Sequence, residues 1–305
     1  MSDSSNEAQQ LAAAYDMLAS AYDGLVQDDF WMRRVLRRRL TQLFAAGDRV
    51  LDVACGTGLE TLFLAQRNVR MVGIDISPRT IERLREKART QGLAELVEAH
   101  VHDASKPLPW AAESFDGIVS TFAGLNTVRS LCDFAVEAHR VLKPHGRLLI
   151  HMLAPSGIWS RLPLIVRLRW RDARVMKRRR QFGKSISGRM VQHQVFPAAE
   201  VYHEFFRRHF ELRRNYSLGF FWPQRLGGWL PVPIAYLFGR AETYLGRLNI
   251  CSDCGRFLVL EMERSGDPRI AWASSGKSAD RPRVGESRFR RSDEWLIAPR
   301  RSTTE

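Results

Sequence analysis

The chain has 305 residues, of which 45% are hydrophobic, and a formal net charge of +14. This composition fits a globular protein of one large domain or two small ones. We find no run of the ~20 apolar residues that a membrane-spanning helix needs. The first ten residues are polar and unlike a secretory signal, so we expect a cytoplasmic protein.

The positive charge is concentrated in the second half of the chain. Residues 1–155 carry 18 basic and 19 acidic residues, whereas residues 156–305 carry 29 basic and 14 acidic ones. A charge that served only solubility would be spread more evenly, so this excess favours contact with an anionic partner.

Two helices are expected at the start of the chain. Residues 9–22 are rich in strong helix formers, and Tyr15 and Tyr22 are seven positions apart, so they share a face. Residues 30–44 predict a second helix with a basic face. We interpret that face as solvent-exposed; its arginines are Arg33, Arg34, Arg37 and Arg38.

A glycine turn follows these helices. Residues 48–58 read D-R-V-L-D-V-A-C-G-T-G, which predicts a buried strand, a tight turn at Gly56 and Gly58, and a helix over 59–66. Glycines allow positive φ and let a ligand approach the backbone closely. Leu59 stands next, so the third glycine of a dinucleotide-binding fingerprint is missing.

The next two expected strands both end beside an acid. Residues 69–76 predict a strand with Asp75 near its end, 17 residues after Gly58, and residues 96–101 predict a strand that leads to Asp103. An acid at the end of the second strand can accept hydrogen bonds from both hydroxyls of a ribose. The pattern therefore predicts a nucleoside site.

The remaining elements complete an α/β pattern. Ser77 and Pro78 are typical of a helix start, and we expect that helix to run to Gln91. Another helix is expected over 131–142, ended by a proline. The further expected strands are 115–120, 146–153, 210–218 and 256–262.

Five ordered segments resemble a known family. They are D-V-A-C-G-T-G, G-I-D-I-S, H-D-A, S-F-D-G-I-V and V-L-K-P-H-G-R-L-L-I. Together they resemble the class I S-adenosylmethionine (SAM) dependent methyltransferases, most closely the small-molecule branch that includes the quinone-biosynthesis methyltransferases. The resemblance covers residues 10–153. It implies an α/β, Rossmann-like, seven-stranded and mostly parallel sheet with an antiparallel last strand, and SAM as cofactor.

The resemblance also implies roles for individual residues. Gly56 and Gly58 would cradle the methionyl part of the cofactor, and Asp52 would accept hydrogen bonds at that end. Asp75 would bind the ribose hydroxyls and Asp103 the adenine amino group, although an acid at 103 could instead cap its own loop. The other positions that the resemblance places beside the cofactor are Ala54, Ile76, Ala104, Ser120 and Tyr15.

Methyl transfer from a sulfonium requires alignment more than acid–base chemistry, so no base is obligatory. His151 is the first candidate for a catalytic base, because it falls at the carboxyl end of the fifth expected strand. It could equally be a core histidine. Tyr22 is the second candidate and His193 a weaker one; in the resembling family, a Tyr-Asp pair like Tyr22-Asp23 lies on a helix that covers the cofactor.

Residues 1–264 would form the methyltransferase domain, with cap insertions at about 158–197 and 218–249. Between Arg161 and Lys184 the first insertion holds ten basic residues and one acid among apolar ones. The second insertion is rich in aromatic residues, proline and glycine. These compositions suit a hydrophobic or aromatic acceptor with an anionic group, or contact with an anionic membrane. Residues 265–305 are expected to be a disordered basic tail.

Four cysteines give little support for a metal. Cys251 and Cys254 form one C-x-x-C pair without a second pair, whereas a structural zinc site needs four ligands. We interpret them as reduced thiols and expect no metal site.

The leading hypothesis is transfer of a methyl group from SAM to a small-molecule acceptor, hydrophobic, aromatic or anionic, by direct in-line displacement. The basic excess also permits an RNA or protein methyltransferase. However, no Asn/Asp-Pro-Pro-Tyr-type motif follows the fourth strand and no RNA-binding module is evident, so nucleic acid is not the expected partner. A non-catalytic SAM-binding protein is the third reading.

Overall fold

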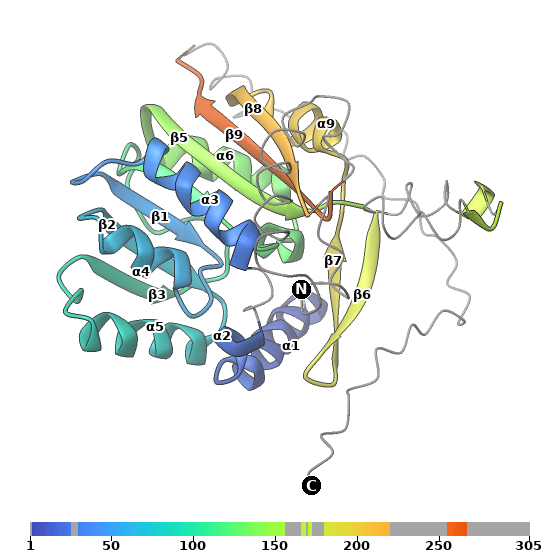
Figure 1. Ribbon diagram of the computed structural model, residues 1–305, viewed down its shortest axis with the longest axis horizontal. Coiled ribbons are helices and arrows are strands. Elements are labelled where there is room, and N and C mark those ends of the chain that lie inside the picture. Colours follow the sequence, from blue (N-terminus) through green and yellow to red (C-terminus); the bar gives the residue numbers. More distant parts are fainter. Residues whose placement is uncertain are drawn as a thin grey trace, which may run out of the picture.

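The computed structural model describes residues 2–25, 30–155, 166–168, 170–172, 180–219 and 255–266. Its centre is a seven-stranded sheet of order β3-β2-β1-β4-β5-β9-β8 (Figure 1). β1 to β5 are parallel, and β9 is antiparallel to both β5 and β8. The expected Rossmann-like sheet is therefore confirmed. Its strands are β1 (Arg49–Val53), β2 (Arg70–Asp75), β3 (Val97–Val101), β4 (Phe115–Ser120), β5 (Leu142–Leu153), β8 (Phe210–Leu218) and β9 (Phe257–Arg264).

Helices cover both faces of this sheet. Figure 1 shows α3 and α4 in front of it and α6 behind it. In the part of the chain that the structure describes, no helix is long and apolar enough to cross a bilayer. The helical elements are α1 (Ser2–Leu18), α2 (Tyr22–Leu25), α3 (Phe30–Leu43), α4 (Leu59–Ala65), α5 (Pro78–Thr90), the 3-10 helix η2 (Gly124–Thr127), α6 (Leu131–Val141), α9 (Ala198–Glu200) and the π-helix η3 (Val201–Phe206).

The apolar runs of the strands follow from this double cover. On β1, Val50 packs in the same cluster as Leu36 and Leu40 of α3. Its neighbour Leu51 points to the other face, where it joins the cluster that contains Phe134 of α6. A strand buried on both faces needs a continuous apolar run instead of an alternating one, which is what the sequence of β1 provides.

Strand register brings the carboxyl ends of the central strands to one edge. Asp52 of β1 lies opposite Gly73 of β2 and Val119 of β4. After β3 the chain crosses to the other half of the sheet, so the switch point lies between the neighbouring strands β1 and β4. Open α/β sheets bind their ligands at the carboxyl edge beside such a switch point.

The first expected helix is divided in two. α1 ends at Leu18 and α2 begins at Tyr22, and the turn between them has hydrogen bonds from the Ala19 N–H to the Asp16 carbonyl and from the Ala21 N–H to the Leu18 carbonyl. Helix propensity is uniformly high here, so the sequence does not mark the break. α5 matches its prediction more closely, because the Ser77 hydroxyl caps it by accepting from the Thr80 N–H at 3.2 Å.

The basic face of α3 is not simply solvent-exposed as expected. The Arg33 residue is only 7% exposed, and its guanidinium lies 2.5 Å from both carboxylate oxygens of Glu60 on α4. Arg37 contacts the same carboxylate at 3.3 Å and also donates to the Leu59 carbonyl. The arginines therefore join α3 to α4, and the prediction of a solvated face is wrong for Arg33.

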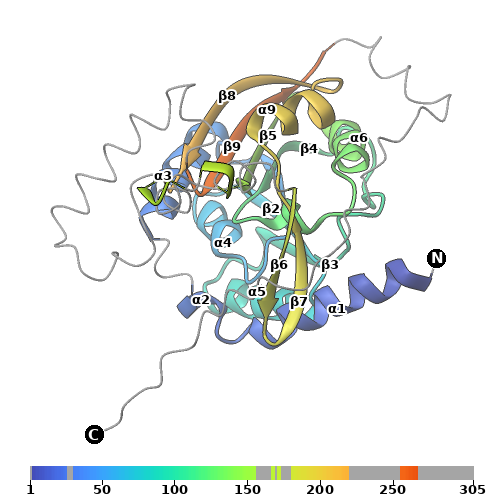
Figure 2. The same cartoon turned by 90° about the vertical axis from the view of Figure 1, so that its right-hand side faces the viewer.

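The first expected insertion contains a hairpin that the sequence analysis did not identify. It consists of β6 (Gln181–Ile186) and β7 (Arg189–Gln194), which pair in an antiparallel sheet of their own. Figures 1 and 2 both show the hairpin beside α1. Ile186 and Val191 pack against Ala14 of α1.

A buried asparagine connects this hairpin to the main sheet. Asn126 of η2 is fully buried, and its amide nitrogen donates to the Gln194 carbonyl at 2.6 Å and to the Leu153 carbonyl at 3.3 Å. Its side-chain oxygen accepts from the Leu153 N–H at 2.8 Å. One side chain therefore holds together η2, the end of β5 and the end of β7.

Several sequence expectations lie outside the described residues. These are the second insertion from residue 220 onward, the pair Cys251 and Cys254, and the tail from residue 267 onward. Within the described ranges, no group of three or more histidine, cysteine, aspartate or glutamate residues is arranged to hold a metal ion.

We predict that His139 on α6 makes the fold sensitive to acid. Burial lowers its pKa to about 4, with further contributions from Arg264 and from His209, whose ring centroid lies 5.4 Å away. The unfolded chain binds a proton near the ordinary pKa of ~6.5, so stability is lost as pH falls below that value. In His139→Gln, urea unfolding should show a smaller loss of stability between pH 7.5 and 5.

At each pH, the free energy of unfolding of the variant should be compared with that of the wild type. The exposed His100 on β3 provides the matched control, because His100→Gln removes a histidine whose side chain is 49% exposed. Equal pH dependence in His139→Gln and the wild type would contradict the prediction.

Candidate functional site

The glycine turn after β1 depends on backbone conformations that glycine favours. Ala54, Gly56 and Gly58 have φ values of 56°, 54° and 79°. A Cβ on Gly58 would lie 2.1 Å from Leu84 Cδ1, so α5 packs directly against the turn. A Cβ on Gly56 would have only Tyr22 Cε1 nearby, at 3.9 Å. Gly58 is therefore needed for packing, while Gly56 leaves space above the backbone.

Asp75 at the end of β2 connects the turn to α5. Its carboxylate accepts the Gly56 N–H on one oxygen and the Ser77 N–H on the other, both at 2.9 Å. Burial raises the pKa of Asp75, although these two hydrogen bonds oppose the effect. Each oxygen retains a further lone pair, so the carboxylate can still accept hydrogen bonds from a ligand.

Asp103 follows β3 at the same sheet edge. Its carboxylate accepts the Ser105 N–H at 2.9 Å, which is the loop cap that the sequence analysis left open as an alternative. The loop-capping role and an adenine contact are compatible, because a carboxylate accepts several hydrogen bonds. The adjacent His102 lines the same cleft, and its backbone N–H donates to the Asp75 carbonyl at 2.9 Å.

A cleft joins these groups. It holds about 710 Å³ of empty space, part of which is open solvent. Its walls come from the loops after β1 to β4, from η2, and from α1 and α2. The predicted site residues that line it are Tyr15, Tyr22, Ala54, Gly56, Asp75, Ile76, Asp103 and Ala104.

Three residues predicted to lie beside the cofactor do not line the cleft. Gly58 packs against Leu84, as described above. The Ser120 hydroxyl is buried and donates to the Val53 carbonyl at 2.9 Å. Asp52 is buried, and one of its oxygens accepts from the Thr61 hydroxyl at 2.6 Å. These residues pack behind the cleft surface and stabilise the turn. That they contact a cofactor directly stays a prediction.

Asp52 is nevertheless electrostatically unusual. Its second carboxylate oxygen is buried and has no hydrogen-bond partner among the described residues. Burial raises its pKa to about 7, with smaller contributions from Glu60 and Asp75. A buried acceptor without a donor is the kind of group that a bound ammonium could satisfy, which fits the methionyl end of SAM.

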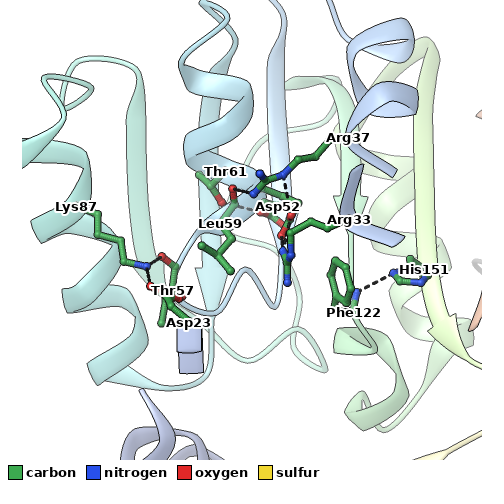
Figure 3. Close-up of polar contacts among 11 residues, drawn as sticks. Asp23, Arg33, Arg37, Asp52, Thr57, Leu59, Thr61, Lys87, Phe122 and His151 are labelled. Atoms are coloured by element: carbon green, nitrogen blue, oxygen red, sulfur yellow. Dashed lines mark hydrogen bonds and ion pairs between the residues drawn. The ribbon is translucent and has the colours of Figure 1, made fainter. Parts of the chain in front are cut away.

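His151 lies at the end of β5, but not on the cleft surface. It is 1% exposed and packs against Phe122 and Phe257, with ring centroids 4.9 and 4.4 Å away. Its Nδ1 accepts the Phe122 N–H at 3.1 Å (Figure 3). Burial lowers its pKa to about 3, with contributions from Arg33 and Arg256. The base role of His151 stays a prediction, and its contacts are those of a core histidine.

Other cleft residues were missed by the sequence analysis. Leu11 lies four positions before Tyr15 on α1, a spacing that puts both on one helix face and could have identified it. His102, Thr127 and Val128 also line the cleft. They come from loops, whose paths a periodic pattern does not reveal.

The residues present fit a nucleoside with a charged tail. Carboxylates at 75 and 103 flank the cleft, the backbone at Gly56 is open, and the unpaired oxygen of Asp52 lies beneath the turn. Apolar side chains of Leu11, Phe122 and Val128 share the same cleft. One cleft therefore offers polar groups for a donor and an apolar surface for a second molecule.

We predict that Gly58→Ala costs more stability than Gly47→Ala. Both glycines have positive φ, 79° and 91°, so each alanine adds ~1–2 kcal/mol of backbone strain. Only at position 58 does the new methyl also meet a buried side chain, Leu84, which adds ~1–3 kcal/mol of overpacking. Urea unfolding of the two variants measures the difference in the free energy of unfolding. Equal losses of this free energy would contradict the prediction and show that α5 shifts to accommodate the methyl group.

Comparison with known proteins identifies a domain within the chain. Residues 50–146 match the methyltransferase domain family. A demethylmenaquinone methyltransferase of Tropheryma whipplei is 32% identical over 148 residues, which are 46% of this chain and 58% of that protein. A ubiquinone/menaquinone biosynthesis C-methyltransferase of Geotalea daltonii is 31% identical over 151 residues, 47% of this chain and 62% of that protein. The match spans about three fifths of these relatives' length.

A solved structure agrees with the sheet topology. A SAM-dependent methyltransferase of Methanosarcina mazei superposes with a TM-score of 0.51 at 21% identity, over 73% of this chain and 95% of that one. At this identity the likeness shows the fold. Together, the sheet order and the domain match show that the chain has the class I methyltransferase fold and that its residues 50–146 form a SAM-dependent methyltransferase domain.

Proposed function

We propose that this chain transfers the methyl group of SAM to a small hydrophobic or aromatic acceptor by direct in-line displacement. The observation that carries the proposal is the composition of one cleft. Asp75 and Asp103 line it together with Leu11, Phe122 and Val128. A nucleoside held by the carboxylates would leave the apolar surface for an acceptor.

The chain's own residues would mainly bind and orient. When bound, SAM supplies a methyl group already activated by the positive charge on its sulfur. Asp75, with both oxygens fixed by backbone N–H groups, is preorganised for the ribose hydroxyls. Tyr15 is an unsuitable base, because burial raises its pKa well above the usual range. Tyr22 also lines the cleft and remains the candidate for accepting an acceptor proton.

The names of the relatives suggest the acceptor class. Those that match this chain are demethylmenaquinone and ubiquinone/menaquinone C-methyltransferases. We therefore propose a quinol-type ring as acceptor, in which a ring carbon forms the bond to the methyl group and then loses its proton. The apolar cleft lining supports an aromatic ring, and transfer to carbon would distinguish this reaction from O- or N-methylation.

We predict that Asp75→Asn weakens binding of S-adenosylhomocysteine about 10- to 100-fold. Hydrogen bonds to a charged acceptor contribute ~1.5–3 kcal/mol each, and the amide cannot accept from both ribose hydroxyls while facing two backbone N–H groups. Isothermal titration measures the affinity. The matched control is Asp133→Asn on α6, an exposed aspartate outside the cleft. Unchanged affinity in Asp75→Asn would contradict the assignment.

The acceptor is tested with methyl-labelled SAM. Incubation with reduced demethylmenaquinone bearing a short side chain should give a product with the label on carbon. Label found in an RNA or protein fraction of a cell extract would instead favour the macromolecular alternatives. Binding of SAM without transfer to any fraction would favour a non-catalytic SAM-binding protein.

We also propose that the basic stretch between Arg161 and Lys184 contacts an anionic membrane. Of its described residues, Val166, Leu168 and Trp170 are 72%, 75% and 58% exposed. Arg167 and Arg171 are exposed beside them. Exposed apolar side chains alternating with arginines suit the interface of an anionic bilayer. A hydrophobic acceptor would be met at the same surface.

We predict that this stretch gives salt-sensitive binding to phosphatidylserine-containing vesicles. Reversing the charge of Arg167 and Arg171 to glutamate should weaken sedimentation at least fivefold per residue, since each basic residue contributes ~1 kcal/mol near such a surface. Trp170→Ser should weaken it as well. Met17→Ser, which removes an apolar side chain that is 59% exposed on α1, is the control. Absence of binding at low salt would remove the membrane proposal.

A further inference from the structure

A tripeptide repeats in the N-terminal segment, and both copies face the cleft. Ala-Tyr-Asp occurs at 14–16 and again at 21–23. Tyr15 lies on α1 and Tyr22 on α2, and both line the cleft. Each tyrosine is followed by an aspartate whose side chain bonds to the body of the domain. The two aspartates contact different residues, Asp16 at the start of α5 and Asp23 at the glycine turn and near the end of α5.

Asp16 holds α1 to the start of α5. One of its carboxylate oxygens accepts the Ser77 hydroxyl at 2.5 Å and the Arg79 N–H at 3.0 Å. Ser77 is also the residue whose N–H donates to Asp75 at 2.9 Å. The helix that carries Tyr15 is therefore fixed two residues after the acid expected to bind the ribose.

Asp23 holds α2 to the glycine turn. One carboxylate oxygen accepts the Thr57 hydroxyl at 2.5 Å, and the other pairs with the Lys87 ammonium. Lys87 also donates to the Thr57 carbonyl at 3.1 Å. Figure 3 shows these three residues side by side, contributed by α2, the turn and α5. We name them the Asp23 clasp.

The Asp23 clasp is polar but only partly shielded. Thr57 is 1% exposed, whereas the side chains of Lys87 and Asp23 are 24% and 41% exposed. Burial alone would raise the pKa of Asp23, but hydrogen bonds from Lys87 and Thr57 outweigh it and hold that pKa below its usual value. The carboxylate is therefore ionised at neutral pH, and the contact can open toward solvent.

The Asp23 clasp holds α2 beside the glycine turn, at the edge of the cleft. Thr57 lies between the two glycines of the turn. Apart from the residues next to Gly56 in the chain, the Tyr22 ring is the only described group within 4 Å of the position that a Cβ on Gly56 would take. A molecule seated on the turn would therefore lie beneath Tyr22. For it to leave on this side, α2 must move, and that movement breaks the contacts of Asp23.

We propose that Asp16 and Asp23 are positioning residues that hold Tyr15 and Tyr22 over the cofactor, and that opening of the Asp23 clasp controls cofactor release. The inference rests on the proposed function, because it takes the cleft as the cofactor site. It goes further by assigning residues outside the cleft lining to the residence time of the cofactor.

The test measures release of tritiated S-adenosylhomocysteine from the full-length protein by rapid dilution and filtration. Asp23→Asn and Lys87→Met should each raise the release rate about tenfold or more, the size expected for loss of a charged hydrogen bond. Asp16→Asn should raise it less, because its contacts do not touch the turn. The melting temperature of each variant without ligand shows whether folding is retained.

Two further variants separate positioning from a structural role. The double variant Asp23→Lys with Lys87→Asp restores an ion pair. It should release the ligand more slowly than Asp23→Lys alone or Lys87→Asp alone. Glu86→Gln removes the exposed pair of Glu86 with Arg83 on the same helix and should leave the rate unchanged. A double exchange that releases as fast as the single variants would overturn the proposed pairing.

The outcomes also distinguish this inference from the proposed function. If the wild type does not bind S-adenosylhomocysteine, the proposed function fails and the inference fails with it. If the wild type binds but Asp23→Asn releases the ligand at the wild-type rate, only the inference fails. A lowered melting temperature in Asp23→Asn with an unchanged release rate would likewise reduce Asp23 to a structural residue.

Discussion

The carboxylate of Asp75 is the contact on which the rest of the site depends. It joins the turn after β1 to the start of α5 through two backbone N–H groups, Gly56 and Ser77. Through Ser77 it is linked to Asp16 and so to α1. The same buried acid that is expected to bind the ribose thus sets the geometry of the glycine turn, the helix start and the N-terminal segment. Burial of such a charge is tolerated because backbone donors satisfy it.

A second group of charges lies on the other side of the turn. Glu60 at the start of α4 is buried and is compensated by Arg33 and Arg37 of α3. Arg33 also lies 4.0 Å above the Phe122 ring, which lines the cleft. Figure 3 shows Arg33 and Phe122 between the glycine turn and His151. Removal of Arg33 would leave a buried carboxylate unpaired, which is commonly far more costly than loss of a surface pair.

The acid of β1 illustrates how one position can serve both fold and ligand. The pKa of Asp52 is raised to about 7 by burial, so the group is partly protonated at neutral pH. A proton bound in the folded state and not in the unfolded state contributes stability that is lost as pH rises through 7. A ligand ammonium beside the unpaired oxygen would favour the ionised form instead. Cofactor and proton would then compete for Asp52.

Much of the central sheet could be predicted because buried parallel strands have a distinct composition. The apolar runs of β1, β2 and β4, each bounded by glycine or acid, mark both the element and its carboxyl end. Even β8 and β9 fall within two residues of the expected ranges. The hairpin of β6 and β7 was missed because its strands are largely polar, with Ile186 and Val191 buried against α1. The burial of Arg33 was missed because its partner is 27 residues away.

The proposed donor and acceptor ends of the cleft differ in how strongly they constrain the sequence. At the proposed donor end, Gly56, Gly58 and Asp75 set the backbone of the turn, so the residues expected beside the cofactor also stabilise the fold. At the acceptor end, Leu11, Phe122 and Val128 provide only apolar surface, and many other side chains could do the same. The position of that wall depends on the packing of α1 against the hairpin, and the Asn126 side chain fixes the hairpin to β5 through three hydrogen bonds with backbone groups. Under the proposed function, acceptor choice would therefore depend on long-range contacts and not on a local motif.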